Sequence, residues 1–227
     1  MKTFILYNQE NPKSVTNAKK SLKSFENFEG WEPRLYNGIW HEHTYVAKGL
    51  YQIEDKERTK FTPKDKHYHA KLACFLSHFS LWERCYALGE TISIVEHDNI
   101  CIGDYTIDYD FDQPVVIQLT LESMINPIKG VVPHKNRNYH NQYVISGPGV
   151  HKIFFQHPHG DVYLAGNTGY TITPKAAKIL IDDCKRNGWT QNDLLINDKM
   201  FPLMYTSPSP IEYRRDMELR SSSINSI

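Results

Sequence analysis

The sequence predicts an α/β fold in which helices cover both faces of a sheet. Short β-prone segments alternate along the chain with amphipathic helical segments, and most connections between them are brief. The chain of 227 residues can bury one substantial core, so we expect a single domain, 1–227, with a mobile tail from about residue 208 to 227. Hydrophobic residues make up 40% of the chain and charged residues 23%, which is typical of a globular protein and excludes a disordered one.

Charge and composition exclude further classes of protein. Lys plus Arg and Asp plus Glu each number 26, so the net charge is zero and no global field favours nucleic acid or an anionic membrane. The first residues lack the apolar stretch of a secretion signal and no later run could span a bilayer, so we expect a cytoplasmic location. The cysteines form no CxxC pair and are predicted to be buried free thiols: Cys74, Cys85, Cys101 and Cys184.

The N-terminal part is predicted to begin with a strand, a turn and a helix. Residues 3–7 are apolar and β-prone, and residues 14–28 have helical periodicity after a turn. A second short strand is expected at 34–36. The polar, aromatic stretch 39–61 follows no pattern of either kind, and we interpret it as a candidate binding loop.

A long helix is predicted to start at Thr62 and to run almost to Gly89. Thr62 can cap its first turn, and Asp65 occupies the position from which the acid of a capping box reaches back. Its apolar stripe keeps helical spacing, and we assign Trp82 and Tyr86 to the core on that ground. Gly89 is a natural terminator just past the end.

A buried strand at 91–95 leads directly into an acidic turn. Glu96 and Asp98 are separated there by one residue, His97. Ligands of open α/β sheets bind beyond the carboxyl ends of the strands, and two acids at such an end can supply oxygen ligands to a divalent cation. Because acidic pairs are also common in ordinary turns, the pair alone is a weak indication of a metal site.

The second half of the chain is predicted to continue the alternation. Strands are expected at 115–119 and 142–146. A helix at 174–186 is capped by Thr173, and a short helix is expected to begin at Thr190.

Two segments together resemble the core of glycosyltransferase family 25. The family pattern is a Gly-Cys-x-x-Ser-His-x-x-x-Trp helix leading to a hydrophobic strand and Glu-Asp-Asp, and this chain has ACFLSHFSLW at 73–82 and ISIVEHD at 92–98. The opening strand and helix, the Thr62 helix start and the segments 169–177 and 192–195 also resemble successive blocks of the family. The resemblance implies a single GT-A-like (Rossmann-like) nucleotide-sugar-binding domain with a mixed, mostly parallel sheet flanked by helices.

The same resemblance implies the reaction. The chain is expected to be a glycosyltransferase that moves a hexose from a nucleotide sugar, with a UDP-sugar as the expected donor, to an acceptor hydroxyl with inversion. The acceptor implied by the family is a lipopolysaccharide or another surface glycan. Mn²⁺ or Mg²⁺ is expected to lie between Glu96, Asp98 and the diphosphate, and the outer acids are preferred because His97 replaces the middle acid of the family.

Four residues are candidates for binding the donor, namely Asn8, Ser77, His78 and His97. By resemblance, Ser77 and His78 face the donor, with His78 touching the sugar or the diphosphate. The alternative is that a helical Ser-His pair merely satisfies a neighbouring strand end. The chain also departs from the family at Ala73, where the pattern has Gly.

Asp193 is the candidate general base that removes a proton from the acceptor hydroxyl, a role that inverting chemistry needs. The alternative is a capping box from Thr190 to Asp193, in which the acid closes the first turn of a helix. Arg214 and Arg215 are interpreted either as contacts to the diphosphate or as part of a solvated tail.

Three other functions stay open at this point. A viral-type glycosyltransferase acting on a hydroxymethylated DNA base would use a local lysine face, although zero net charge argues against nucleic acid. His97 would mark a catalytically inactive relative that binds a sugar nucleotide. Pairs of the form His-x-His, at 41–43, 67–69 and 157–159, would build a metallohydrolase site. The lysines of the first alternative are Lys48, Lys56, Lys60, Lys64, Lys66 and Lys71.

Overall fold

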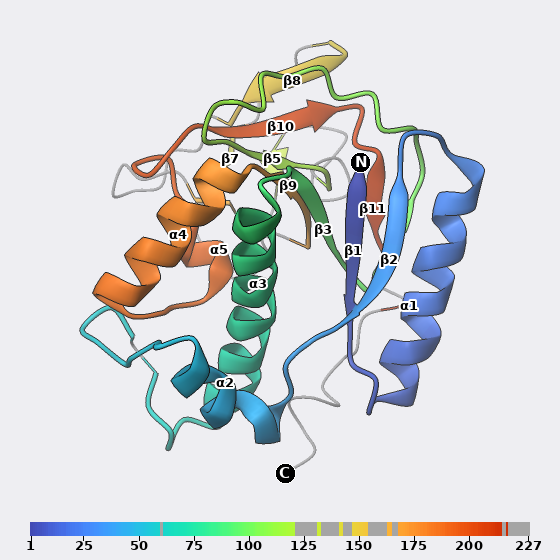
Figure 1. Ribbon diagram of the computed structural model, residues 1–227. Helices are drawn as coiled ribbons and strands as arrows, with labels where there is room; N and C mark the ends of the chain where they lie inside the picture. Colours follow the sequence, from blue (N-terminus) through green and yellow to red (C-terminus); the bar gives the residue numbers. More distant parts are fainter. Residues whose placement is uncertain are drawn as a thin grey trace.

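A seven-stranded sheet lies at the centre of the computed structural model (Figure 1). The structure describes residues 1–59, 61–120, 131–132, 141–142, 147–153, 163–164, 168–214 and 217. In order across the sheet, the strands are β2 (Glu32–Asn37), β1 (Lys2–Tyr7), β3 (Ile92–Glu96), β9 (Gly169–Ile172), β5 (Val116–Gln118), β10 (Leu203–Ser207) and β8 (Gly149–Lys152).

The strand directions confirm the predicted mixed sheet. β1 pairs in parallel with both β2 and β3, and β5 pairs in parallel with β10. β9 is antiparallel to its two neighbours β3 and β5, and β8 is antiparallel to β10. All strands except β8 and β9 therefore run in one direction, and β1, β2 and β3 end on the same edge of the sheet.

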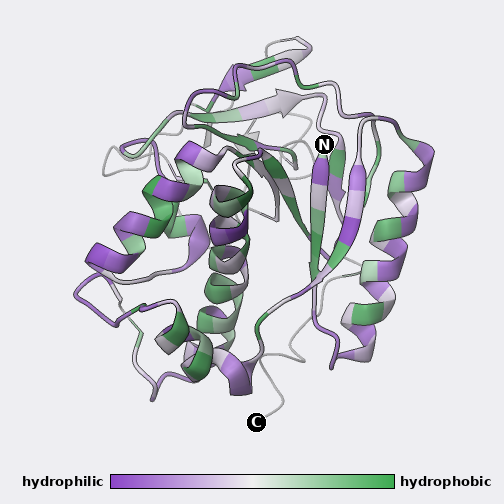
Figure 2. Ribbon diagram, viewed as in Figure 1, coloured by the Kyte–Doolittle hydropathy of each residue, from purple (hydrophilic) through white to green (hydrophobic). Residues whose placement is uncertain are grey.

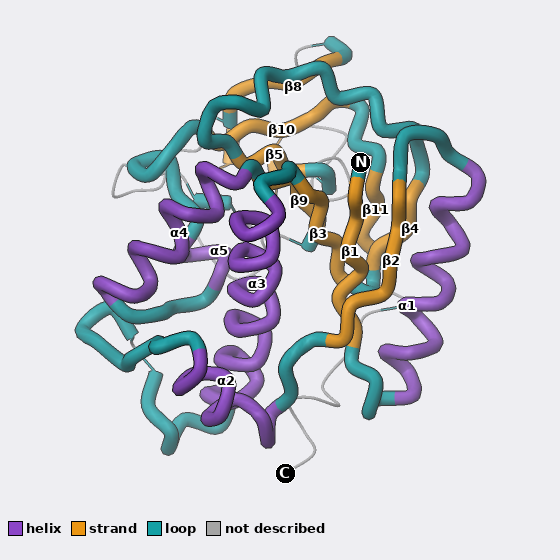
Figure 3. Tube along the Cα trace, in the orientation of Figure 1, coloured by secondary structure: helices purple, strands orange, loops and turns teal. Residues whose placement is uncertain are grey.

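Helices cover both faces of this sheet, as predicted (Figures 1 and 3). One face carries α1 and a short 3₁₀ turn, η1, and the other carries α3 and α4. A second turn, η2, and the short helix α2 pack on α3, and α5 follows α4 in the chain. Their bounds are α1 (Pro12–Ser24), η1 (Phe25–Asn27), η2 (His41–His43), α2 (Thr44–Leu50), α3 (Tyr68–Leu88), α4 (Pro174–Asn187) and α5 (Asn192–Leu195).

Strand alternation divides the core into two clusters. Phe4 and Leu6 of β1 face the larger cluster under α3 and α4, whereas Ile5 faces the smaller one under α1. In the hydropathy colouring, α1 and α4 carry polar residues beside apolar ones, and β2 is partly polar (Figure 2). α3 is buried over most of its length, so its apolar residues are not confined to one stripe.

The long helix begins later than predicted. The Asp65 carboxylate does accept a hydrogen bond from the Thr62 backbone N–H, but it closes an isolated turn, and α3 starts at Tyr68 after His67. Gly89 ends the helix in the left-handed conformation, as predicted. The assignment of Tyr86 to the core is wrong, because its side chain is 48% exposed beside Lys178 of α4.

Two small sheets complete the described fold. β4 (Asn99–Cys101) pairs with β11 (Ile211–Tyr213), and β6 (Val131–Val132) pairs with β7 (Asn141–Gln142). The tail expected from about residue 208 is wrong for β11, because Ile211 is buried in the smaller core cluster. Residues 218–227 lie outside the described residues. No helix in the described part of the chain combines the length and the apolar character needed to cross a bilayer.

The carboxylate of Asp55 ties the candidate loop at 39–61 to the core. Asp55 accepts hydrogen bonds from the Trp189 indole at 2.6 Å and the Tyr68 hydroxyl at 3.0 Å, and it pairs with Lys48 at 2.7 Å. Burial raises the pKa of Asp55, but the bonds from Lys48, Trp189 and Tyr68 outweigh it and hold the pKa below its ordinary value. The loop is therefore an ordered part of the fold around Asp55.

Asp55→Asn is expected to lower the free energy of unfolding at pH 7 by about 1 kcal/mol, and the melting temperature by roughly 2–4 °C. The figure is small because the Asp55 side chain is 37% exposed and solvent screens its ion pair. A lowered folded-state pKa stabilises the fold above the unfolded value of about 3.9, and this stabilisation disappears as pH falls through the folded pKa. Thermal unfolding at pH 7 and pH 3 should thus show a difference between wild type and variant that shrinks in acid; an unchanged difference would contradict the assignment.

Candidate active site

The acidic turn lies where the sequence places it, directly after β3. Glu96 is the last residue of the strand, and a turn through His97 and Asp98 leads into β4. The strand is buried from Ile92 to Val95, whereas Glu96 is only partly buried. Since β1, β2 and β3 are parallel, the ends of all three strands meet at this edge, toward which the start of α3 also points (Figure 1).

Asn99 holds the acidic turn in shape. Its side-chain amide donates to the backbone carbonyl of Glu96 at 3.1 Å, to that of Thr168 at 3.2 Å and to Asp98 Oδ1 at 3.1 Å. Its own Oδ1 accepts from the Thr168 hydroxyl at 3.2 Å. The side chain is fully buried, so these bonds replace water completely. Sequence reasoning missed this residue, because a single Asn after a turn has no distinguishing spacing.

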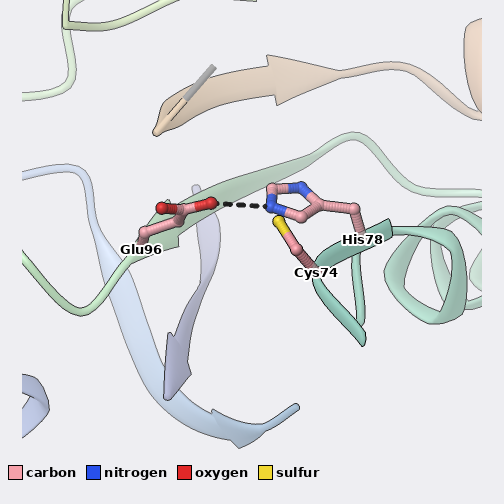
Figure 4. Close-up of side chains that lie close together, drawn as sticks. All are labelled: Cys74, His78 and Glu96. Carbon is pink, nitrogen blue, oxygen red and sulfur yellow. Dashed lines mark hydrogen bonds and ion pairs between the residues drawn. The ribbon is translucent and has the colours of Figure 1, made fainter. Parts of the chain in front are cut away.

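A chain of hydrogen bonds runs through the core to Glu96. The Trp82 indole N–H donates to the Tyr170 hydroxyl at 2.9 Å, and that hydroxyl lies 2.8 Å from His78 Nδ1. On the other side of the ring, His78 Nε2 lies 3.1 Å from Glu96 Oε1 (Figure 4). The Trp82 N–H can only donate, so the Tyr170 hydroxyl is free to donate to Nδ1, which leaves the proton on Nε2 for Glu96. We call this chain the histidine relay.

The relay fixes the charge of Glu96. Burial alone would raise the pKa of this carboxyl, but the hydrogen bond from His78 outweighs it and lowers the pKa. Glu96 is therefore a carboxylate at neutral pH, held by His78 at one oxygen. His78 is only 1% exposed and both of its ring nitrogens are bonded within the protein, so it positions Glu96, and its contact with the donor stays a prediction.

The thiol of Cys74 is influenced by the two carboxylates of the acidic turn and by a third, Asp193. Its side chain is exposed, contrary to the prediction, yet burial raises the pKa of its thiol well above the ordinary value. A group that solvent reaches and protein closely surrounds is expected in a recess. The charges of Glu96, Asp193 and Asp98 raise the pKa further, in that order. Cys74 of α3 therefore lies close to Glu96, and the charges of Asp98 and Asp193 also act on it.

The alternative role for Asp193, a capping box, is wrong. The residue that caps α5 is Gln191, whose side chain makes no capping hydrogen bond, and Thr190 precedes the cap. Asp193 is exposed, and its charge acts on the thiol of Cys74. It is therefore placed to meet a ligand near the acidic turn.

Two candidate donor-binding residues are engaged with the backbone. The Ser77 hydroxyl donates to the Ala73 carbonyl at 2.7 Å and accepts from the Ile39 N–H at 2.8 Å, which fastens the end of β2 to α3. A Cβ at Gly38 would lie 2.8 Å from the same hydroxyl, so this close approach requires glycine. Asn8 uses its Oδ1 to accept from two backbone N–H groups in the turn before α1. Both residues shape the loops around the site.

His97 keeps an unused ring nitrogen. Its Nε2 is buried and has no hydrogen-bond partner among the described residues. Burial lowers the pKa of the ring, which outweighs the opposing effects of Glu96 and of a hydrogen bond to the Leu6 backbone. The neutral ring therefore presents an unsatisfied polar atom beside the acidic turn, which a ligand group would satisfy.

The two arginines and the His-x-His pairs singled out in the sequence do not form a further described site. Arg214 donates its backbone N–H to the Asp98 carbonyl at 2.8 Å, and Arg215 lies outside the described residues. His43 lies with Glu10 and Glu42 in a fully exposed group that could hold a metal ion, and the pair at 157–159 lies outside the described residues. No His-x-His pair supplies both of its rings to a described metal-binding group, so the metallohydrolase alternative has no structural support there.

The described residues also include one sulfur-containing group near the site. The ligand atoms of Cys74, His78 and Glu96 lie within 4.8 Å of one another (Figure 4). Both nitrogens of His78 are already bonded, one to Tyr170 and one to Glu96, so the ring has no nitrogen left for a metal ion in this arrangement. The carboxylate oxygens of Glu96 and Asp98 are hard ligands of the kind that Mg²⁺ and Mn²⁺ prefer, and they fit such an ion better.

Comparisons with known proteins give one family model and two similar structures. A family model described as "Glycosyltransferase family 25 (LPS biosynthesis protein)" matches residues 52–196, a range that contains the relay, the acidic turn and Asp193. No curated protein matches the chain. The chain is similar to a crystal structure of an active-site mutant of LgtC, with 11% identity and a TM-score of 0.46 over 95% of this chain and 87% of that one. It is also similar to a structure of the galactosyltransferase LgtC with donor and acceptor sugar analogs, with 10% identity, a TM-score of 0.44 and the same coverage.

Proposed function

The chain belongs to glycosyltransferase family 25 and is a glycosyltransferase, and we propose that it moves a hexose from a UDP-sugar to a hydroxyl of a lipopolysaccharide or another surface glycan, with inversion. The observation that carries the proposal is the pair Glu96 and Asp98 directly after β3, with Glu96 bonded to His78 and Asp98 to Asn99. These two acids at the carboxyl edge of the sheet suit a cation site, and Asp193, whose charge reaches the Cys74 thiol, is the candidate for the base. The expected cytoplasmic location stays a prediction.

The donor diphosphate is proposed to bind over the acidic turn. Glu96 and Asp98 would hold Mn²⁺ or Mg²⁺, which supplies positive charge to the leaving diphosphate. The two carboxylates are prepared differently, since Asn99 bonds to one oxygen of Asp98 and His78 to one of Glu96. Such outer partners orient ligands and tune their affinity for metal. The unused Nε2 of His97 supports a contact with the donor from the same turn.

Asp193 is proposed to act as the general base. Inversion needs a carboxylate that takes a proton from the acceptor hydroxyl as this oxygen attacks the anomeric carbon. The C–O bond to the acceptor forms while the bond to the diphosphate breaks, and the proton passes to the carboxylate. Support comes from the exposure of Asp193 and from its nearness to the acids of the turn.

The DNA-modifying alternative loses support from the lysines. Lys48 is paired with Asp55, and Lys56 donates to two carbonyls at the end of α4. Lys71 lies over the ring of Phe61. These cations therefore have protein partners, and a lysine face prepared for phosphates is not supported among them.

Calorimetric titration of UDP, UDP-glucose and UDP-galactose, with and without Mn²⁺, tests the proposal. Wild type should bind with higher affinity in Mn²⁺, and Asp98→Ala should lose that gain because one oxygen ligand is removed. Asp104→Ala, at an exposed acid that bonds to the backbone of Glu29 away from the site, is the matched control and should keep it. Folded wild type that binds none of the three would overturn the donor assignment, and binding without any transfer or hydrolysis would identify an inactive relative.

A further inference from the structure

Three aromatic rings from separate elements meet at the start of α3. His41 of η2 and His69 of α3 have ring centroids 4.4 Å apart, and Tyr45 of α2 lies edge-on to His69 at 5.3 Å. His41 and Tyr45 are exposed and His69 is partly buried. We call these three residues the ring cluster. It contains one histidine from each of two His-x-His pairs, 41–43 and 67–69. The metallohydrolase alternative does not account for this arrangement.

The ring cluster is not explained by packing alone. The Tyr45 side chain is 54% exposed, although an aromatic ring stabilises a fold mainly when it is buried. Contiguous exposed apolar surface beside a site typically marks a place where a ligand or partner binds. The exposed rings of the cluster are therefore available to a ligand.

The ring cluster lies beside the proposed transfer site. His69 precedes Cys74 by five residues of the same helix, which corresponds to roughly 7.5 Å along its axis. η2 follows β2, whose carboxyl end lies at the same edge as the acidic turn, and Ser77 fastens this connection to α3 through Ile39. Figure 1 shows α2 and the start of α3 together at this end of the molecule. A chain of sugars that reaches from the site along α3 would meet these rings.

The chemistry of the ring cluster favours a sugar over a lipid surface. A pyranose presents an apolar C–H face that packs on aromatic rings and hydroxyl groups at its rim that need hydrogen bonds. The exposed imidazole of His41 can supply such bonds, and His69 Nδ1 is buried and has no hydrogen-bond partner among the described residues. A site for anionic lipid would instead need free cations, and the neighbouring Lys48 is paired with Asp55.

We propose that His41, Tyr45 and His69 form a stacking platform for a pyranose of the acceptor glycan, beyond the sugar that receives the hexose. This inference rests on the proposed function, because it assigns the acceptor side of the same site. It makes Tyr45 a specificity-determining residue that acts on the acceptor and leaves the donor unaffected.

The test is an NMR titration of the ring ¹H–¹³C signals with methyl glycosides of glucose, galactose, mannose and N-acetylglucosamine. At least one glycoside should shift the signals of all three rings. Tyr45→Ala should weaken that binding roughly 3- to 10-fold, the range of one aromatic contact, whereas Tyr45→Phe should retain it. Tyr86→Ala, at a similarly exposed tyrosine near the far end of α3, is the control and should bind as wild type does.

Two results would overturn the platform. One is the absence of ring shifts with all four glycosides. The other is equal weakening by Val46→Ala, since Val46 is exposed on α2 but is not part of the ring cluster, and this would indicate a general apolar docking surface. Titration of UDP separates the two proposals. Glycoside binding without UDP binding would support the platform and contradict the UDP-sugar donor. UDP binding without glycoside binding would support the donor and contradict the platform.

Discussion

Replacing Asp193 by Asn is expected to lower kcat by roughly 10²- to 10⁴-fold and to leave the affinity for UDP unchanged. The amide keeps the size of the side chain but cannot accept the proton of the acceptor hydroxyl. Folding should be little affected, because Asp193 is exposed and does not cap α5. The loss is therefore expected in the chemical step, with donor binding at the acidic turn intact.

The measurement is UDP release from UDP-glucose and UDP-galactose in the presence of deacylated lipooligosaccharide, together with calorimetry of UDP. Asp198→Asn, at another exposed acid five residues further along the chain, is the matched control and should retain wild-type turnover. Wild-type turnover in the Asp193 variant would rule it out as the base. Equal loss of UDP affinity and of turnover would instead move Asp193 to the donor side of the site.

Local patterns predicted the elements that lead into the site. β3 and α4 could be recognised because an apolar run, a Thr-Pro start and a terminal Asn-Gly each act over a few neighbouring residues. The position of Glu96 and Asp98 followed from the strand that precedes them. The start of α3 could not be recognised, since the bond of Asp65 to Thr62 is as compatible with an isolated turn as with a helix.

The roles of individual site residues depended on contacts between distant parts of the chain. Ser77 and His78 were predicted to face the donor, yet their partners, Ile39 and Tyr170, come from a loop and a strand far away in sequence. Likewise, the nearness of Asp193 to Glu96 is visible only through Cys74 in the folded chain. Spacing along the sequence carries no information about such pairs. The position of the acidic turn could therefore be predicted, but the role of each residue around it could not.

Tyr170→Phe tests the histidine relay, and we expect it to lower the free energy of unfolding by about 2–4 kcal/mol. The substitution removes one oxygen and leaves the Trp82 indole N–H and His78 Nδ1 without their partner. Trp82 and Tyr170 are fully buried and His78 nearly so, so water cannot easily replace the bond. Chemical denaturation should show the loss of stability.

Transfer activity separates a relay from simple packing. Without the Tyr170 hydroxyl, the His78 ring is no longer fixed with its proton toward Glu96, so turnover should fall even where the variant is fully folded. Tyr105→Phe is the matched control, because its hydroxyl makes only a long 3.4 Å contact with Thr171, the residue next to Tyr170, and its loss should cost less than about 1 kcal/mol with activity retained. A Tyr170 variant as active as wild type would mean that Glu96 keeps its orientation without the relay, and the acidic turn would then depend on Asn99 for its shape.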